Sequence, residues 1–365
     1  NNNGKVGALG ISYPGFYATM AALSNHPALK AVSPQAPVTD WFMGDDWHHN
    51  GAVMLIDAFN FYSGFGQPRP KPTTIGPKEK DFLVKDSYKF FLETGALKNI
   101  NAKYFHDSIA FWNSMLAHPN LDEWWKARNP RNFVTDVKPA MLIVGGLFDA
   151  EDCFGAWRLY EAIENKSKNA DNRLVIGPWS HGQWAQSEGS FLGNVKFGSK
   201  TSYWYQNNVE IPFFNYHLKG KGAIRLSEAI IFFSGENQWH QLSQWPPREK
   251  LDKPIYLQPD GKLSWTKPTT IKSSSEYISD PAKPVPYMED VHDGRASKYM
   301  TDDQRFASRR PDVLVFETDV LGDDLTLAGT LVADLLVSIT GTDADFIVKV
   351  IDVFPDDFSY SRKDE

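Results

Sequence analysis

The sequence has a single cysteine among its 365 residues, so no disulfide bond can form within the chain. It also has no apolar run that approaches the ~20 residues needed to span a bilayer. The sequence also has no large excess of charge of one sign, because its formal net charge is only −7. This balance gives no reason to expect nucleic acid or a membrane as a partner. What is present is the composition of a globular protein, 42% apolar and 14% aromatic, with a length that suits two or three domains.

A serine stands between glycines near the start of the chain, in the stretch Gly10-Ile11-Ser12-Tyr13-Pro14-Gly15. The residues before it, 5–9, predict a short buried strand, and residues 16–23 predict a helix that Pro14 could begin. A serine at a tight strand-to-helix turn is typical of the nucleophile elbow of α/β-hydrolases. The spacing G-x-S-x-x-G is one residue longer than the usual one, so the pattern alone also fits an ordinary turn with a surface serine.

Two later strands also end in polar residues that carry chemistry. The apolar stretch 141–144 leads through two glycines to Asp149, and the stretch 173–177 leads into a loop that carries His181. The order Ser12, Asp149, His181 is the order of the catalytic triad in α/β-hydrolases. One crossover helix, predicted over 154–166, fits between the last two strands, whereas the much longer stretch before Asp149 must contain an insertion.

The chain therefore divides into three predicted parts. Residues 1–50 and 133–222 form a partial α/β-hydrolase domain, and 51–132 form a helical cap with helices expected over 86–97 and 107–117. From residue 229 the pattern changes to short strands separated by Pro, Gly and Asp, clearest at 312–316 and 331–339. We expect residues 223–365 to form a partial jelly-roll β-sandwich.

These motifs together resemble the family of α-amino acid ester hydrolases, glutaryl acylases, cocaine esterase and X-prolyl dipeptidyl-peptidases. The resemblance covers the whole chain and rests on the serine turn and on five further stretches, which are Gly146-Leu147-Phe148-Asp149, Gly177-Pro178-Trp179-Ser180-His181-Gly182, residues 213–222, residues 235–239 and residues 309–316. It implies an α/β-hydrolase domain, a helical cap, a C-terminal jelly roll and an acyl-enzyme mechanism. In that mechanism His181 takes the proton of Ser12, Asp149 orients the imidazole, and the Tyr13 N–H is one oxyanion donor.

Within this family the chain is most similar to the α-amino acid ester hydrolases, which have a carboxylate cluster for the α-ammonium group of the substrate. The resemblance assigns Glu151 and Asp152 to that cluster, with Asp46 as the third member in preference to its neighbour Asp45. An ammonium group about 4 Å from one carboxylate gains about 4 kcal/mol at an effective dielectric near 20. The plainer alternative is that Glu151 and Asp152 stabilise the N-terminus of the helix that follows them.

The expected function is hydrolysis or acyl transfer on esters or amides of α-amino acids, with a small ester, amide or short peptide as the substrate. An X-prolyl dipeptidyl-peptidase and a glutaryl or β-lactam acylase are the alternatives within the family, and a non-catalytic binding protein is the alternative outside it. No cofactor is expected. No metal is expected either, because the adjacent side chains of His48 and His49 would rarely point at one ion.

The ends of the sequence are unusual for such a fold. The first residue is not methionine, only one strand precedes Ser12, and a strong strand pattern over 346–354 stands close to the last residue. We expect that sequence is missing at both ends, including the strand that would supply the family's second oxyanion donor, a tyrosine hydroxyl. The expected location is the bacterial periplasm or the medium, and a homo-oligomer is left open.

Overall fold

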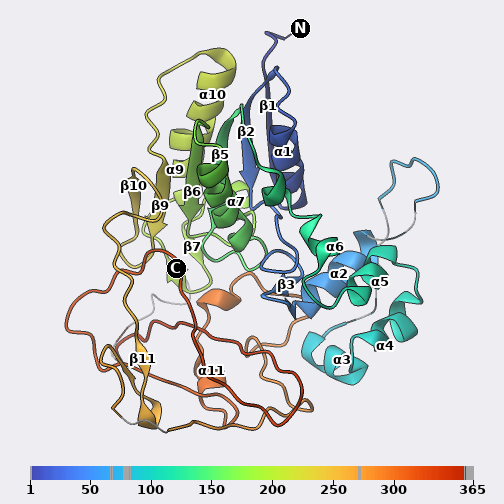
Figure 1. Cartoon of the computed structure of the whole chain (residues 1–365), viewed down its shortest axis with the longest axis vertical. Coiled ribbons are helices and arrows are strands. Elements are labelled where there is room, and N and C mark those ends of the chain that lie inside the picture. Colours follow the sequence, from blue (N-terminus) through green and yellow to red (C-terminus); the bar gives the residue numbers. More distant parts are fainter. Residues whose placement is uncertain are drawn as a thin grey trace. The chain divides into compact units, whose positions relative to one another are not determined.

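The computed structural model describes residues 2–65, 67, 69–76, 82, 84–269, 273–356 and 358 (Figure 1). The chain separates into two compact units. The first unit comprises Asn1–Ser243 together with Val291–Thr301, and the second comprises Gln244–Asp290 together with Asp302–Glu365.

The first unit is built on one six-stranded sheet in the order β1-β2-β5-β6-β9-β10. The strands are β1 (Val6–Ile11), β2 (Leu29–Gln35), β5 (Ala140–Gly146), β6 (Asn172–Gly177), β9 (Ala229–Phe233) and β10 (Gln238–Leu242). The first five run parallel and β10 is antiparallel to β9. Because parallel strands share one carboxyl edge, the residues that follow β1, β5 and β6 meet at the same edge. The predicted α/β class is therefore confirmed.

Helices cover both faces of this sheet, because β5 is buried along its whole length and needs apolar cover on each side. Leu142 and Val144 belong to the cluster packed by Tyr205 and Phe213. On the opposite face a Cβ on Gly145 would meet Ala156 at 2.8 Å. The covering helices are α1 (Tyr13–Leu23), α7 (Cys153–Lys166), α9 (Thr201–Tyr205), η3 (Gln206–Glu210) and α10 (Ile211–Lys219).

In the sequence, a helical segment with its own aromatic core connects β2 to β5. Phe59, Tyr62, Trp112 and Trp125 are buried there together. Its helices are α2 (Leu55–Phe65), α3 (Ser87–Thr94), α4 (Lys98–Ile100), η1 (Asn101–Phe105), α5 (Ala110–Ala117), α6 (Glu123–Lys126) and η2 (Pro130–Phe133). The helices expected over 86–97 and 107–117 are present as α3 and α5. Among the described residues, no helix is both long and apolar enough to cross a membrane.

Short elements complete the first unit and supply the regular structure of the second. They are β3 (His48–His49), β4 (Ala52–Val53), α8 (Gln183–Gln186), β7 (Phe191–Leu192), β8 (Val195–Lys196) and η5 (Tyr299–Thr301) in the first unit, and β11 (Tyr256–Leu257), η4 (Pro259–Gly261), β12 (Leu263–Ser264) and α11 (Arg305–Ser308) in the second.

The C-terminal strands differ from the expectation in two ways. Residues 229–233, expected to open the jelly roll, instead form β9 beside β6 in the central sheet, because the same apolar run suits any buried strand. Residues 312–316 and 331–339 form no strand in the described part of the chain, apart from the nearby single bridge between Lys262 and Glu317. A strand needs a neighbouring strand to take its backbone hydrogen bonds, and an apolar pattern alone does not supply one.

Candidate active site

Ser12 lies at the strained turn between β1 and α1. Its backbone angles are φ 67° and ψ −127°, outside the regions that most side chains adopt. The two flanking glycines permit this turn, because a Cβ on Gly10 would lie 2.3 Å from the Pro14 carbonyl oxygen and a Cβ on Gly15 would lie 2.5 Å from that of Gln35. The turn is therefore as tight as the sequence pattern predicts, and it places Ser12 at the N-terminus of a helix.

Asp149 and His181 are brought together from the loops that follow β5 and β6. The two loops are joined by backbone hydrogen bonds, among them one of 3.0 Å from the Phe148 N–H to the Trp179 carbonyl. His181 Nδ1 donates to Asp149 Oδ2 over 2.8 Å. The other oxygen, Asp149 Oδ1, accepts from the backbone N–H groups of Glu151 and Asp152 at 2.9 and 3.0 Å. The carboxylate is fully buried and has a fixed orientation.

The turn of Ser12 borders the loop of His181. A Cβ on Gly182 would lie 3.7 Å from Cγ2 of Ile11, the residue before Ser12. Within the described residues the Ser12 hydroxyl has no hydrogen bond to His181, whose Nε2 instead lies 3.5 Å from Glu151 Oε2. The structure thus pairs His181 with Asp149 and places Ser12 next to them without a hydrogen bond.

Tyr13 is the first residue of α1, and its ring lies within an aromatic group. The N–H groups of the first helical turn have no acceptor within their own helix, so they are available to an anion. The Tyr13 ring stacks on Trp41 with centroids 6.4 Å apart and contacts Phe65 edge-on at 5.3 Å. The start of α1 next to Ser12 is therefore bordered by aromatic side chains.

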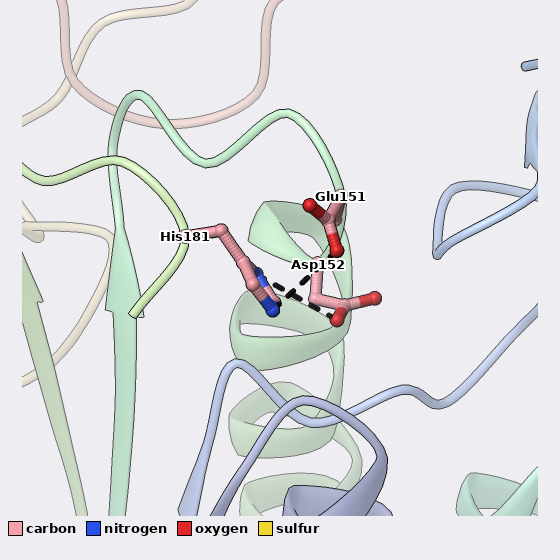
Figure 2. Close-up of side chains that lie close together, drawn as sticks. All are labelled: Glu151, Asp152 and His181. Carbon is pink, nitrogen blue, oxygen red and sulfur yellow. Dashed lines mark ion pairs between the residues drawn. The ribbon is translucent and has the colours of Figure 1, made fainter. Parts of the chain in front are cut away.

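Glu151 and Asp152 point toward His181 (Figure 2). Asp152 Oδ2 lies 3.9 Å from His181 Nδ1, and the Asp152 side chain is fully buried. Neither carboxylate oxygen of Asp152 has a hydrogen-bond partner in the described structure. A buried carboxylate without a hydrogen bond is costly, and such a group is a place where a cation is stabilised.

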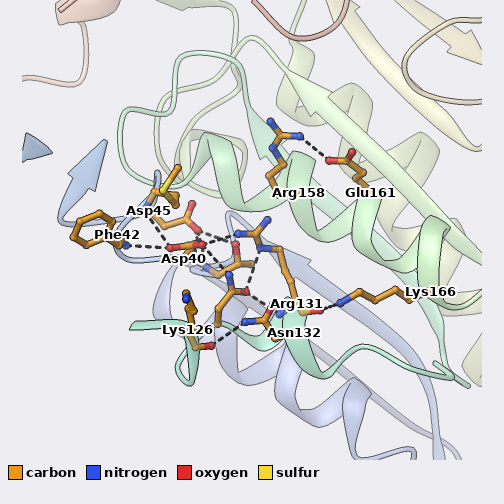
Figure 3. Close-up of polar contacts among 12 residues, drawn as sticks. Asp40, Phe42, Asp45, Lys126, Arg131, Asn132, Arg158, Glu161 and Lys166 are labelled. Carbon is orange, nitrogen blue, oxygen red and sulfur yellow. Dashed lines mark hydrogen bonds and ion pairs between the residues drawn. The ribbon is translucent and has the colours of Figure 1, made fainter. Parts of the chain in front are cut away.

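Asp45 and Asp46 have different surroundings. Asp45 Oδ2 accepts three hydrogen bonds of 2.7–2.9 Å, from the N–H and hydroxyl of Thr39 and from the Asp40 N–H, and these bonds stabilise its own turn. The ion pair between Asp40 and Arg131 stabilises the same turn (Figure 3). Asp46 Oδ2 accepts from Trp41 Nε1 at 2.9 Å, and the Asp46 N–H donates to the Glu151 carbonyl at 3.2 Å. Asp46 is thus linked to the loop of Glu151 and Asp152.

Burial and mutual repulsion perturb the titration of this acidic group. Burial raises the pKa of Asp46 to about 7, with the charges of Asp45 and Asp149 adding to the rise. Burial likewise raises the pKa of Asp152 well above its usual range, and nearby acids, first Asp46, add to it. For His181 burial lowers the pKa, but the charge and hydrogen bond of Asp149, followed by the charge of Asp46, outweigh burial and raise it above 6.5.

Sequence reasoning missed two residues of this site, Arg295 and Asp57. Arg295 donates to both oxygens of Asp57, at 2.9 and 3.1 Å from Nε, and its Nη2 donates to Glu151 Oε1. Asp57 lies in the first turn of α2, and Arg295 lies in the segment Val291–Thr301 of the first unit. No spacing pattern connects positions so far apart in the chain.

A cation has a suitable donor set here. Ligand atoms of Glu151, Asp152 and His181 lie within 4.8 Å of one another, a set that suits a metal ion or an ammonium group. The histidines that the sequence raised as an alternative differ from each other. His48 is buried and its Nδ1 donates to the Trp41 carbonyl at 2.6 Å, whereas His49 is exposed.

Comparison with known proteins identifies a family for both parts of the chain. A family profile described as X-Pro dipeptidyl-peptidase (S15 family) matches residues 1–183. A second profile, described as the X-Pro dipeptidyl-peptidase C-terminal non-catalytic domain, matches residues 222–362.

Individual relatives agree with these profiles. The chain is 28% identical over 380 residues to a protein named cocaine esterase from Rhodococcus sp. (strain MB1 Bresler), with 97% of this chain and 63% of that protein aligned. Two solved structures each have a TM-score of 0.78 and 35% identity, an aminopeptidase from a marine sediment Thaumarchaeota archaeon and an α-amino acid ester hydrolase. They cover 86% and 87% of this chain and 52% and 53% of their own chains. The chain thus spans about three fifths of the curated relative and about half of each solved structure.

Proposed function

The chain belongs to the X-Pro dipeptidyl-peptidase (S15) family, and on that premise we propose that it is a serine hydrolase of esters or amides of α-amino acids. The proposed reaction is acyl transfer through a covalent acyl-enzyme on Ser12. His181 Nε2 accepts the proton of the Ser12 hydroxyl, and Asp149 holds the ring with its proton on Nδ1 and stabilises the imidazolium that forms. The Tyr13 N–H donates to the developing oxyanion.

For His181 to act as the base, its Nε2 must be directed at Ser12 instead of Glu151. The hydrogen bond to Asp149 defines the tautomer that leaves Nε2 unprotonated and able to accept. Hydrogen bonds of catalytic groups are often long in an enzyme without substrate and tighten when substrate is bound. A small rotation of His181 about its bond to Asp149 is therefore part of the proposal.

The observation that carries the proposed substrate class is the buried carboxylate of Asp152, which has no hydrogen-bond partner and lies 3.9 Å from His181. An α-ammonium group next to the scissile carbonyl would pair with Asp152, Glu151 and Asp46 while the carbonyl faces Ser12. Each contact of about 4 Å would gain about 4 kcal/mol before desolvation. A glutaryl group carries a carboxylate, which the same acids would repel, so the ammonium reading is favoured.

A dipeptidyl-peptidase is the second candidate, because the free N-terminus of a peptide is also an ammonium group. The two candidates differ in the distance between that group and the scissile bond, which is one residue in an amino acid ester and two in a dipeptide. The acids reach His181 itself at 3.5 and 3.9 Å, and this closeness favours the shorter substrate.

Three further parts of the proposal rest on the family rather than on the described contacts. They are the jelly-roll form of the chain after β10, the role of 51–132 as a cap over the site, and a tyrosine hydroxyl as a second oxyanion donor. A small-molecule ester, amide or short peptide is the proposed partner.

The test compares two esters on the product of the complete gene. Alanine methyl ester and methyl propanoate have the same acyl skeleton and differ in the α-ammonium group. Because that group also makes the alanine ester intrinsically more reactive, its recognition is measured by how far a substitution changes the ratio of the two kcat/KM values. We expect the alanine ester to be preferred and Glu151→Gln to reduce the ratio by about tenfold through KM. The exposed Glu161 on α7 offers a matched control, Glu161→Gln, which should leave the ratio unchanged.

The chemistry is tested separately with a fluorophosphonate probe. The probe should label the wild-type protein and fail to label Ser12→Ala. Labelling that survives Ser12→Ala would refute the nucleophile. A ratio near one in the wild type would refute the ammonium pocket, and faster cleavage of an alanyl-prolyl anilide than of the alanine ester would favour the peptidase.

A further inference from the structure

The segment Val291–Thr301 is part of the first unit, although the profile of the C-terminal non-catalytic domain covers it. It is held near both ends. The Ser87 N–H donates to the His292 carbonyl at 2.8 Å. At the other end Thr301 packs against β7, where its Oγ1 lies 3.3 Å from the Leu192 carbonyl while donating at 2.8 Å to the Lys298 carbonyl. Arg295 lies between these two points, so its backbone is anchored in the unit that holds the candidate active site.

Arg295 bridges two carboxylates in a nearly dry environment. The exposed fractions of the side chains are 11% for Arg295, 14% for Asp57 and 25% for Glu151. Nε donates to both oxygens of Asp57, and Nη2 donates to Glu151 Oε1. Charge-assisted hydrogen bonds of this kind restrict the rotation of the acceptor. Burial raises the pKa of Asp57, and the charge and hydrogen bond of Arg295 counteract that rise.

The two oxygens of Glu151 therefore have different surroundings. Oε1 contacts Arg295, and Oε2 lies 3.5 Å from His181 Nε2 on the side of Asp152 (Figure 2). Because Arg295 takes only one oxygen, the other stays directed into the site. Without the guanidinium, Glu151 would be free to rotate, and Asp57 would be left buried without a counter-charge.

We propose that Arg295 is a positioning residue that sets specificity for the α-ammonium group by holding Glu151 through a bridge to Asp57. This inference rests on the proposed function, since it concerns how that same site recognises its substrate. It assigns part of the recognition to a residue in the region matched by a domain described as non-catalytic.

The sign of the effect follows from counting charges. Arg295 pairs with Asp57 and Glu151, and the other two acids of the group, Asp46 and Asp152, are left to attract a cation with Arg295 in place. Removing Arg295 leaves Glu151 and Asp57 without their counter-charge, and crowded acids relieve their repulsion by taking up protons. A protonated acid attracts an ammonium group poorly, so the loss of Arg295 weakens ammonium binding.

The experiment again uses the kcat/KM ratio of alanine methyl ester to methyl propanoate, on the product of the complete gene. We expect Arg295→Met to lower the ratio by about tenfold, mainly through KM of the alanine ester. Arg295→Lys keeps the charge and should recover part of the loss. Arg158→Met removes a partly exposed arginine on α7 that pairs with Glu161, and it should leave the ratio at the wild-type value.

A double variant tests whether Arg295 acts through Glu151. Since Glu151→Gln already removes the charge that Arg295 holds, adding Arg295→Met to it should change the ratio by less than about twofold. A further tenfold fall in the double variant would overturn the inference. An unchanged or higher ratio in Arg295→Met alone would also overturn it, because Arg295 would then be structural or a competitor of the ammonium group.

Two outcomes separate this inference from the proposed function. If the wild type prefers the alanine ester and Glu151→Gln abolishes the preference, but Arg295→Met does not, the inference fails and the proposed function stands. If the wild type has no preference, both fail. Should Arg295→Met not fold, Asp57→Asn decides, because it keeps the side-chain volumes and weakens the bridge from the other end. We expect it to lower the ratio by about threefold, and an unchanged ratio would overturn the inference.

Discussion

Replacing Asp149 by asparagine should nearly abolish turnover while leaving the fold intact. Asp149 Oδ1 accepts two backbone N–H groups, from Glu151 and Asp152, and Oδ2 accepts from His181 Nδ1. Asparagine has one oxygen. If that oxygen keeps the two backbone hydrogen bonds, the amide NH₂ faces Nδ1, and the proton of the ring moves to Nε2, where it prevents His181 from acting as a base.

The alternative orientation of the asparagine is costly, which makes the prediction sharp. Turning the NH₂ toward the two backbone N–H groups would leave both without an acceptor, at about 1–3 kcal/mol each. The wrong tautomer is therefore the stable one, and we expect kcat for methyl propanoate to fall by about 10⁴-fold, which corresponds to about 5.5 kcal/mol in the activation barrier.

The assay measures kcat for methyl propanoate, which has no ammonium group, so that recognition by the acidic residues does not enter. Circular dichroism and a thermal melt of Asp149→Asn should match those of the wild type. Glu161→Gln on the same loop-and-helix unit serves as the control. A kcat within tenfold of the wild type in a folded Asp149→Asn variant would refute the assignment of Asp149 as the partner that orients His181.

Three further predictions concern pH and stability. The pKa of His181 is raised above 6.5, and the neutral ring is the active form. The value of kcat/KM for methyl propanoate should therefore fall as the pH is lowered through a midpoint above 6.5. A midpoint below about 6 would show that the acids around His181 do not raise its pKa. Gly15→Ala should lower the free energy of unfolding, measured by denaturant titration, by about 1–3 kcal/mol, since its Cβ would lie 2.5 Å from the Gln35 carbonyl oxygen. The control Gly76→Ala, whose Cβ would meet no atom within 4 Å, should leave the stability unchanged. Arg131→Met leaves the buried Asp40 without its ion-pair partner and should lower the free energy of unfolding by about 3–5 kcal/mol. The control Arg158→Met should lower it by only about 0–1 kcal/mol. Equal melting temperatures of the two variants would show that the pair between Arg131 and Asp40 does not stabilise the fold.

The parts of the site that could be predicted from the sequence are those set by local backbone chemistry. Gly10 and Gly15 leave room for a tight turn at Ser12, and this requirement is visible in the residue types alone. Asp149 and His181 follow apolar runs that end in glycine, and parallel strands bring such ends to one edge. The pairing of these two side chains therefore agrees with the sequence pattern, and the catalytic role of Ser12 stays a prediction.

The choice between neighbouring acids could not be predicted in the same way. Asp45 and Asp46 are adjacent and chemically identical, and only the turn that encloses the Asp45 carboxylate separates them. The sheet to which a strand belongs could not be predicted either. Residues 229–233 would suit a β-sandwich as well as the position that they occupy beside β6.

The amino-acid sequence by itself determined the class of the sheet, the strained turn at Ser12 and the order of the acid and the histidine, because each can be recognised from local patterns, which are apolar runs and the glycines and polar residues that follow them. The tertiary structure alone decided that Asp152 is buried without a hydrogen-bond partner, that the Asp46 N–H donates to the Glu151 carbonyl, and that Arg295 pairs with Glu151. The physical reason is that burial and charge pairing depend on which segments pack together. Arg295 and Glu151 are 144 residues apart in the chain, and no local pattern records that they meet.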